Sequence, residues 1–94
     1  MRESEKTLER KLSRLVKERG GYCFKFLPMH VNGIPDRICL LPGGRMFFAE
    51  MKSTGDKADP LQKVWHKRLR RLGFDVHVID NSDYLNEVLQ TYDA

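Results

Sequence analysis

The sequence predicts an α/β fold of the α+β kind, in which helices cover a mixed four-stranded sheet. Apolar residues recur at helical spacing in three segments of the chain. Four short segments between them are rich in β-branched and aromatic residues and are separated by glycine or proline. The resulting order, αβββαβα, suggests an antiparallel meander followed by a parallel crossover strand. We expect these elements to form one domain over residues 1–94.

The first helix and three strands are expected in the first half of the chain. Ser4 can cap the helix, and Gly20 ends it. Its apolar face consists of Leu8, Leu12, Leu15 and Val16. Strands are expected at residues 22–27, 36–41 and 45–52. Pro42-Gly43-Gly44 is typical of a three-residue hairpin turn between the last two strands.

The second half should begin with a helix at Pro60, because Asp59 can cap it and proline suits the first helical position. The apolar stripe of this helix consists of Leu61, Val64, Trp65, Leu69 and Leu72. A strand at residues 74–79 and a helix at residues 82–92 follow. Trp65 and Phe74 are expected in the core.

The charge of the chain favours a polyanionic partner, since the net charge is +4 and the isoelectric point is about 9.3. No apolar stretch approaches the ~20 residues of a membrane span, and no apolar segment follows the N-terminus as in a signal peptide. We therefore expect a cytosolic protein without a membrane partner. Cys23 and Cys39 are expected as buried free thiols. The spacing of the histidines excludes a zinc-finger or HExxH site.

Two acidic residues should face each other on the central hairpin. If Gly43 is its centre, Asp36 lies opposite Glu50, and both share the face of Ile38 and Phe48. A bulge at the turn could shift this register by one residue. Like charges at such positions are destabilising.

Three arrangements would relieve that repulsion: one carboxylate takes a proton, a lysine neutralises the pair, or a divalent cation bridges it. Carboxylate oxygens suit magnesium or manganese. Such an ion activates water and neutralises charge in phosphodiester hydrolysis. Lys52 projects from the same face as Glu50 and would add a positive charge. The pattern therefore predicts a nuclease site.

These residues also carry a resemblance. Gly33-Ile34-Pro35-Asp36 followed by Glu50-Met51-Lys52 looks like the signature of the PD-(D/E)xK nuclease superfamily, whose core has the same element order. Across nearly its whole length the chain resembles the small, stand-alone, phage-type VRR-NUC domains. The matching motifs are Leu8-Glu9, Gly20-Gly21, Phe24-Lys25, Gly33-x-Pro35-Asp36-Arg37, Leu41-Pro42-Gly43-Gly44, Glu50-x-Lys52, Pro60-Leu61-Gln62-Lys63 and Leu72-Gly73-Phe74. The Val-Arg-Arg tripeptide that names the family is absent.

The resemblance implies roles for particular residues. Asp36 and Glu50 would bind Mg²⁺ or Mn²⁺ together with the backbone carbonyl of Met51, and Lys52 would assist the attacking water. Glu9 would join the site directly or through a water molecule, although Glu5 is a rival on the same helix. Gln62 would orient the site or contact a phosphate.

Basic residues would form the nucleic-acid-binding surface, although solvated charge is the ordinary reason for such residues. The expected contacts are Lys25, Arg37, Lys57, Lys63, Lys67, Arg70 and Arg71. Lys25 shares a strand face with Cys23 and Leu27, so it is also a candidate neutraliser of the acidic pair. The polar loop at residues 53–59 should approach the nucleic acid.

The activity favoured by this reading is that of a metal-dependent endonuclease for branched DNA, cutting four-way junctions as a homodimer in the cytoplasm of a phage host. No small-molecule substrate is expected. The alternatives are a non-catalytic DNA-binding module of the same fold, a sequence-cutting restriction-type enzyme and a non-enzymatic interaction domain. The intact trio Asp36, Glu50 and Lys52 argues against the first alternative.

Overall fold

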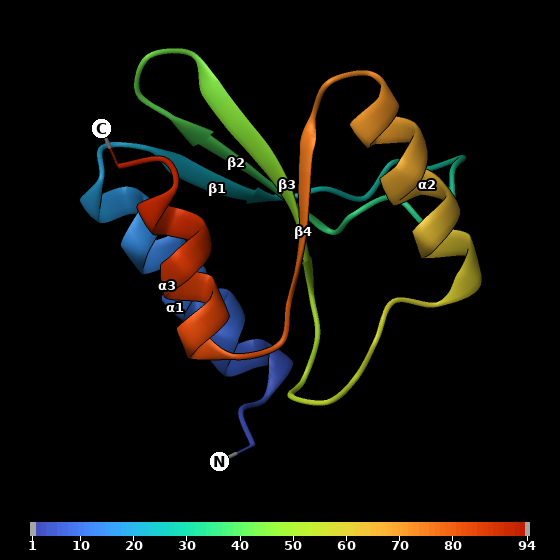
Figure 1. Ribbon diagram of the computed structural model, residues 1–94, viewed down its shortest axis with the longest axis horizontal. Helices are drawn as coiled ribbons and strands as arrows, with labels where there is room; N and C mark the ends of the chain where they lie inside the picture. The colour runs from blue at the N-terminus through green and yellow to red at the C-terminus, as the bar shows by residue number, and fades with distance from the viewer. Residues whose placement is uncertain (1, 94) are drawn as a thin grey trace.

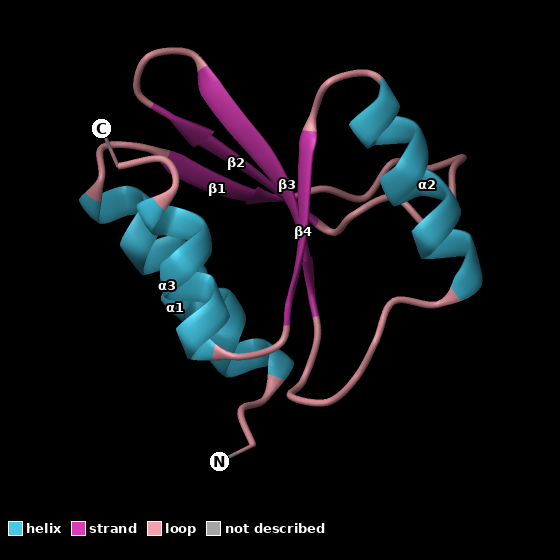
Figure 2. Ribbon diagram, in the orientation of Figure 1, coloured by secondary structure: helices cyan, strands magenta, loops and turns pink. Residues whose placement is uncertain are grey.

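The computed structural model describes residues 2–93, and within them the predicted order of helices and strands is present (Figure 1). The elements are α1 (Glu5–Glu18), β1 (Tyr22–Lys25), β2 (Arg37–Leu41), β3 (Arg45–Met51), α2 (Pro60–Arg71), β4 (Asp75–Ile79) and α3 (Ser82–Gln90). Helices α1 and α3 lie side by side on one side of the sheet, and α2 lies on the other (Figure 2). The predicted α+β architecture is confirmed.

The sheet is mixed, with the strand order β1-β2-β3-β4. Strands β1, β2 and β3 are antiparallel neighbours, and β4 runs parallel to β3. Ile38 pairs with Phe48 and Leu41 with Arg45, which is the predicted register. Gly43 and Gly44 both adopt positive φ angles, of 83° and 74°, in the hairpin turn. These two glycines close the turn without shifting the register.

Several strand and helix ends differ from the prediction. Strand β1 stops at Lys25 rather than at residue 27, because beyond it only the Phe26 amide continues the pairing, by donating to the carbonyl of Asp36 at 2.7 Å. Asp36 itself precedes β2. Helix α3 ends at Gln90 rather than at Tyr92, whose amide bonds to the carbonyl three residues back, as in a tightened last turn.

The hydrophobic core lies between the sheet and helices α1 and α3. Leu8, Leu12 and Val16 of α1 are fully buried, as predicted. They pack in one cluster with side chains of the sheet and α3: Cys39, Leu41, Phe47, Ala49, Met51, Ile79, Leu85, Val88 and Leu89. Every core residue of β2 and β3 in this cluster has an odd number, so the even-numbered residues face α2.

Helix α2 is less buried than its apolar stripe predicts. Leu61, Val64 and Leu72 are 48%, 42% and 73% exposed, and the buried residue of the helix is His66. Phe74, expected in the core, is 39% exposed. The physical reason is that α2 packs mainly on β4 and does not cover the part of the sheet nearer β1. The prediction that Phe74 is a core residue is therefore wrong, and Trp65 is only partly buried.

The loop at residues 26–36 is held against α2 at Gly33. This glycine has a φ of 93°, and a Cβ there would lie 2.8 Å from the Leu61 side chain and 3.0 Å from Trp65. Both the backbone conformation and the close approach require glycine. The contact fixes the loop that leads to Asp36 relative to α2.

Both cysteines are free. Cys39 is buried, but Cys23 is only partly buried because β1 is an edge strand, and their sulfur atoms lie 3.2 Å apart. No helix among residues 2–93 has both the length and the apolar character to cross a membrane.

Candidate active site

Asp36 lies at the end of the 26–36 loop, one residue before β2. Its Oδ1 accepts a hydrogen bond of 3.2 Å from the amide of Met51, the last residue of β3. Arg37 pairs with Ala49, so the next position of the register sets Asp36 opposite Glu50. The two residues therefore lie opposite each other where the hairpin strands end.

The surroundings of Asp36 disfavour its charged form. Burial raises the pKa of Asp36 to about 6, and the nearby Glu50 carboxylate adds to the rise. The hydrogen bond from Met51 opposes it, while Glu5 and Glu9 contribute further repulsion. In the absence of a cation, the ionised form of this carboxylate is therefore destabilised by burial and by repulsion from its neighbours, a condition called electrostatic tension below.

Glu50 is almost completely buried, with 3% of its surface exposed, on the α2 side of the sheet. Its Oε1 lies 3.5 Å from Nε2 of His66, which is 2% exposed. Neither atom has a hydrogen-bond partner among the described residues. An ionised, buried carboxylate without such a partner is costly.

Both candidate glutamates of α1 reach Asp36. One carboxylate oxygen from each of Glu5, Glu9 and Asp36 lies within 4.8 Å of the other two. Glu5 and Glu9 are one helical turn apart, so they point from the same side of α1. Glu5 and Glu9 therefore both lie close enough to Asp36 to join a metal site.

Arg37 was expected to contact nucleic acid, yet it lies within the site. Its Nη2 is 3.0 Å from Oε2 of Glu9, and the two side chains are only 15% and 23% exposed. The Nε atom of Arg37 is buried and has no partner among residues 2–93. This arginine holds Glu9 beside Asp36.

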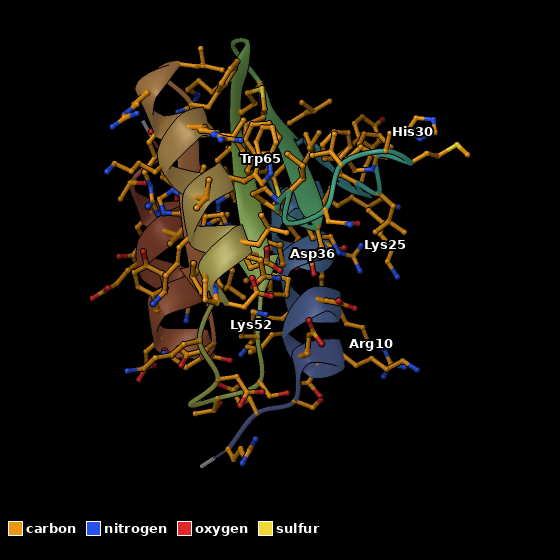
Figure 3. All side chains as sticks on the ribbon, turned by 90° about the vertical axis from the view of Figure 1, so that its right-hand side faces the viewer. Arg10, Lys25, His30, Asp36, Lys52 and Trp65 are labelled. Carbon is orange, nitrogen blue, oxygen red and sulfur yellow. The ribbon has the colours of Figure 1, made fainter. Side chains whose placement is uncertain are left out.

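Figure 3 shows Lys52 and Asp36 in the space between α2 and α1. Lys52 directly follows β3, and its amide donates a 2.9 Å hydrogen bond to the carbonyl of Ile79. Lys25, in contrast, is exposed on the edge strand and points away from this space (Figure 3). It forms none of the ion pairs found among residues 2–93, so the expectation that it neutralises the acidic pair is wrong.

Gln62 takes part in the cap of α2. Its Oε1 accepts a 2.9 Å hydrogen bond from the amide of Asp59, whose carboxylate accepts one from the Gln62 amide at 2.8 Å. The capping box uses the amide oxygen of the Gln62 side chain, and its amide nitrogen has no hydrogen-bond partner within the described residues 2–93.

Three of the predicted basic residues line one cavity of about 330 Å³ between α2, β4 and the loop at residues 53–59. They are Lys57, Lys63 and Arg70, and His66 lines the same cavity. Lys67 and Arg71 are exposed on α2. His66 was not predicted as a site residue, because the spacing of the histidines matches no metal-binding motif. Its place four residues after Gln62 was the available signal.

The donor set fits a hard divalent cation. Asp36, Glu50, Glu5 and Glu9 offer only oxygen, as Mg²⁺ and Mn²⁺ prefer. The burial of the Glu50 carboxylate and the raised pKa of Asp36 are both conditions that a cation would relieve.

Comparisons with known proteins relate the chain to nucleases. No family model matches the chain. It is 39% identical over 79 residues to a protein of Acyrthosiphon pisum secondary endosymbiont phage 1 described as "Putative nuclease p44", a match covering 84% of this chain and 85% of the phage protein. A solved structure described as a VRR_NUC domain superposes with a TM-score of 0.86 at 26% identity, covering 97% of this chain and 100% of its own. The chain belongs to the VRR-NUC nuclease family.

Proposed function

We propose that this protein is an endonuclease that hydrolyses DNA phosphodiester bonds with Mg²⁺ or Mn²⁺. The observation that carries the proposal is the carboxylate cluster of Asp36 with Glu5 and Glu9 of α1, beside the buried Glu50 of β3, whose charge helps to raise the pKa of Asp36. Such a cluster, partly buried and in electrostatic tension, suits a divalent cation.

Asp36 and Glu50 would hold the ion with the backbone carbonyl of Met51, and Glu9 and Glu5 would bind it directly or through water. The ion supplies a water molecule of lowered pKa and charge neutralisation at the phosphoryl group. Arg37 keeps Glu9 in place through their ion pair. The hydrogen bond from the Met51 amide fixes the orientation of Asp36.

Lys52 would stabilise negative charge as it develops on the attacking oxygen and the phosphoryl group. A fixed cation in a partly buried position is more effective in that role than a solvated one. Gln62 would direct its free amide nitrogen to a phosphate oxygen, since its amide oxygen is used in the cap. Lys57, Lys63 and Arg70 around the cavity, with Lys67, Arg71 and Lys25 on the surface, would contact the DNA backbone.

Metal-dependent cleavage is the direct test. The protein should cut labelled DNA with Mg²⁺ or Mn²⁺, bind Ca²⁺ with little turnover, and lose activity in chelator. Cleavage should weaken steeply with added salt because phosphate contacts release counterions. Full activity in chelator would contradict the proposal, and DNA binding without cleavage would indicate a binding module.

We further propose that the substrate is a four-way DNA junction and that the enzyme is a homodimer. Resolving a junction requires two nicks related by a two-fold axis, which a closed dimer supplies. The open sheet face offers an apolar contact surface: Tyr22 stacks on Phe24 and pairs across the strands with Leu40, and these residues are 63%, 53% and 40% exposed. Exposed apolar surface of this kind marks interaction sites.

Light scattering should give twice the chain mass of 11.0 kDa. Phe24→Glu should reduce it to one chain, because it buries a charge in the contact. Met29→Glu is the matched control, since Met29 is 91% exposed in the loop after β1. Labelled four-way junctions should be cut in preference to linear and flapped DNA. A monomer that cuts all three equally would remain a nuclease but not a junction resolvase.

A further inference from the structure

Among residues 2–93, the buried Glu50 forms one ion-pair contact, and its partner is a histidine of α2. Oε1 of Glu50 and Nε2 of His66 are 3.5 Å apart, and the two residues are 3% and 2% exposed. Neither atom has a hydrogen-bond partner within residues 2–93. A slight rotation of either side chain would bring them into hydrogen-bonding range.

A buried carboxylate that ligates a cation through one oxygen still needs a partner for the other. Leaving that oxygen unsatisfied costs about 1–3 kcal/mol or more for a charged group. Metal-ligating carboxylates are ordinarily held by a hydrogen bond from a neighbouring group, which fixes their orientation. On the α2 side of Glu50, His66 is the residue placed to provide it.

We propose that His66 is a positioning residue for Glu50: its Nε2–H donates to Oε1 and leaves the second carboxylate oxygen directed at the ion. The inference rests on the proposed function of Glu50 as a metal ligand. It requires only the neutral imidazole with its proton on Nε2.

The position of His66 is well anchored. Asp59 caps the helix that carries it, and the neighbouring Trp65 packs against the loop at Gly33. His66 also lines the cavity of Lys57, Lys63 and Arg70. Helix α2 therefore carries both the proposed phosphate contacts and the group that orients the metal ligand.

The test compares two amide replacements in the 94-residue chain. In His66→Gln the side-chain amide nitrogen reaches the position of Nε2. In His66→Asn the side chain is shorter by one methylene, so its amide nitrogen does not reach that position. Mn²⁺ affinity should be measured by calorimetry without DNA. We expect His66→Asn to bind Mn²⁺ about 10–100-fold more weakly than wild type, and His66→Gln to bind nearly as wild type does. The kcat for cleavage should follow the same order while the KM for DNA stays unchanged.

His77→Asn is the matched control. His77 is a half-buried histidine of β4 whose ring lies beside Phe47 on the core face and contacts the Tyr92 hydroxyl. Its replacement should leave the Mn²⁺ affinity unchanged. Melting in chelator separates folding from metal binding, and His66→Leu replaces His66→Asn if the latter does not fold.

The outcomes separate the two proposals. Wild-type affinity in a folded His66→Asn overturns the positioning role, as does an equal loss in His66→Asn and His66→Gln, which indicates packing alone. Both results leave the nuclease proposal standing if wild type binds Mn²⁺ and cleaves DNA. A wild-type protein that neither binds Mn²⁺ nor cleaves overturns both.

Discussion

The two faces of the sheet differ in what covers them. On the side of α1 and α3, apolar side chains such as Leu12 and Phe47 are fully buried. On the side of α2, Leu61 and Phe24 remain about half exposed, while the charged Glu50 is buried. The second face also buries the apolar Phe48 and Val76, but beside them it buries Glu50 Oε1 and His66 Nε2, which have no hydrogen-bond partner within residues 2–93.

This difference separates stability from function. The first face gains free energy from apolar burial and contains no charged residue among its buried side chains. The second face holds polar groups that cost stability without a ligand, a feature common at functional sites. Substitutions on the two faces should therefore affect different measured quantities.

The largest effect expected is on activity, at Lys52. Lys52→Ala should reduce kcat about 100–1000-fold, as loss of a group that stabilises transition-state charge does, with little change in melting temperature. Single-turnover cleavage of labelled DNA with Mg²⁺ measures it. Lys11→Ala, which removes a lysine that bonds to Ser82 instead, is the control and should retain activity. Undiminished cleavage by Lys52→Ala would contradict the assigned role.

The second effect is on stability, and it compares one substitution on the two faces. Leu12→Ala should lower the free energy of unfolding by about 2–5 kcal/mol, because it leaves a cavity in the closed core. Leu61→Ala should cost well under about 1 kcal/mol, since 48% of Leu61 is already exposed. Urea denaturation at one protein concentration measures both. Equal losses would show that α2 is as tightly packed as α1.

A smaller effect is expected at Gln62, where the role in capping α2 can be separated from the proposed role in contacting a phosphate. Gln62→Glu keeps the acceptor that caps α2 but replaces the amide donor with a carboxylate oxygen. We expect an unchanged melting temperature and about a tenfold loss of cleavage, comparable to losing one hydrogen bond to a charged group. Retained cleavage together with a retained cap would restrict Gln62 to its structural role.

The smallest effect is a gain in stability without metal. Because the pKa of Asp36 is raised from 3.8 to about 6, the folded chain binds this proton more tightly than the unfolded chain. Stability is therefore lost as pH rises from about 4 to 6. In chelator at pH 7, Asp36→Asn should be more stable than wild type by about 1–2 kcal/mol, a figure reduced for the partial exposure of Asp36.

Thermal melts at pH 4 and pH 7 measure this difference, which should shrink at the lower pH. Added Mg²⁺ should then raise the melting temperature of wild type more than that of Asp36→Asn, because only a ligand of the native state stabilises it. An Asp36→Asn protein that melts below wild type in chelator would show that Asp36 is not in tension.

Local patterns were sufficient to predict the hairpin. Gly43 and Gly44 locate the turn, and the alternation on either side fixes which residues face each other, so the opposition of Asp36 and Glu50 could be derived. The end of β1 could not. Residues 22–27 have the same strand propensity throughout, and the strand stops where its partner β2 begins, at Arg37. A contact distant in sequence decides that boundary.

For helix α2, the sequence predicted the position of the helix but not how much of it is buried. Its periodicity correctly identified the apolar side of the helix, but periodicity does not say how much of that side another layer covers. The contact between His66 and Glu50 depends on that layer and so was not predicted. Glu5 and Glu9 could not be separated because a spacing of four residues gives both the same direction.

The glycine at position 33 has a consequence for how this protein could be recombined with its relatives. The loop that delivers Asp36 and the helix that delivers His66 fit together only where no side chain intervenes. A chimaera that takes residues 26–36 from a homologue with a side chain at position 33 would press that side chain against Leu61 and Trp65 of α2, even with every acidic residue retained. In such a case the two segments, separated in the chain by the whole hairpin, would have to be exchanged as a pair.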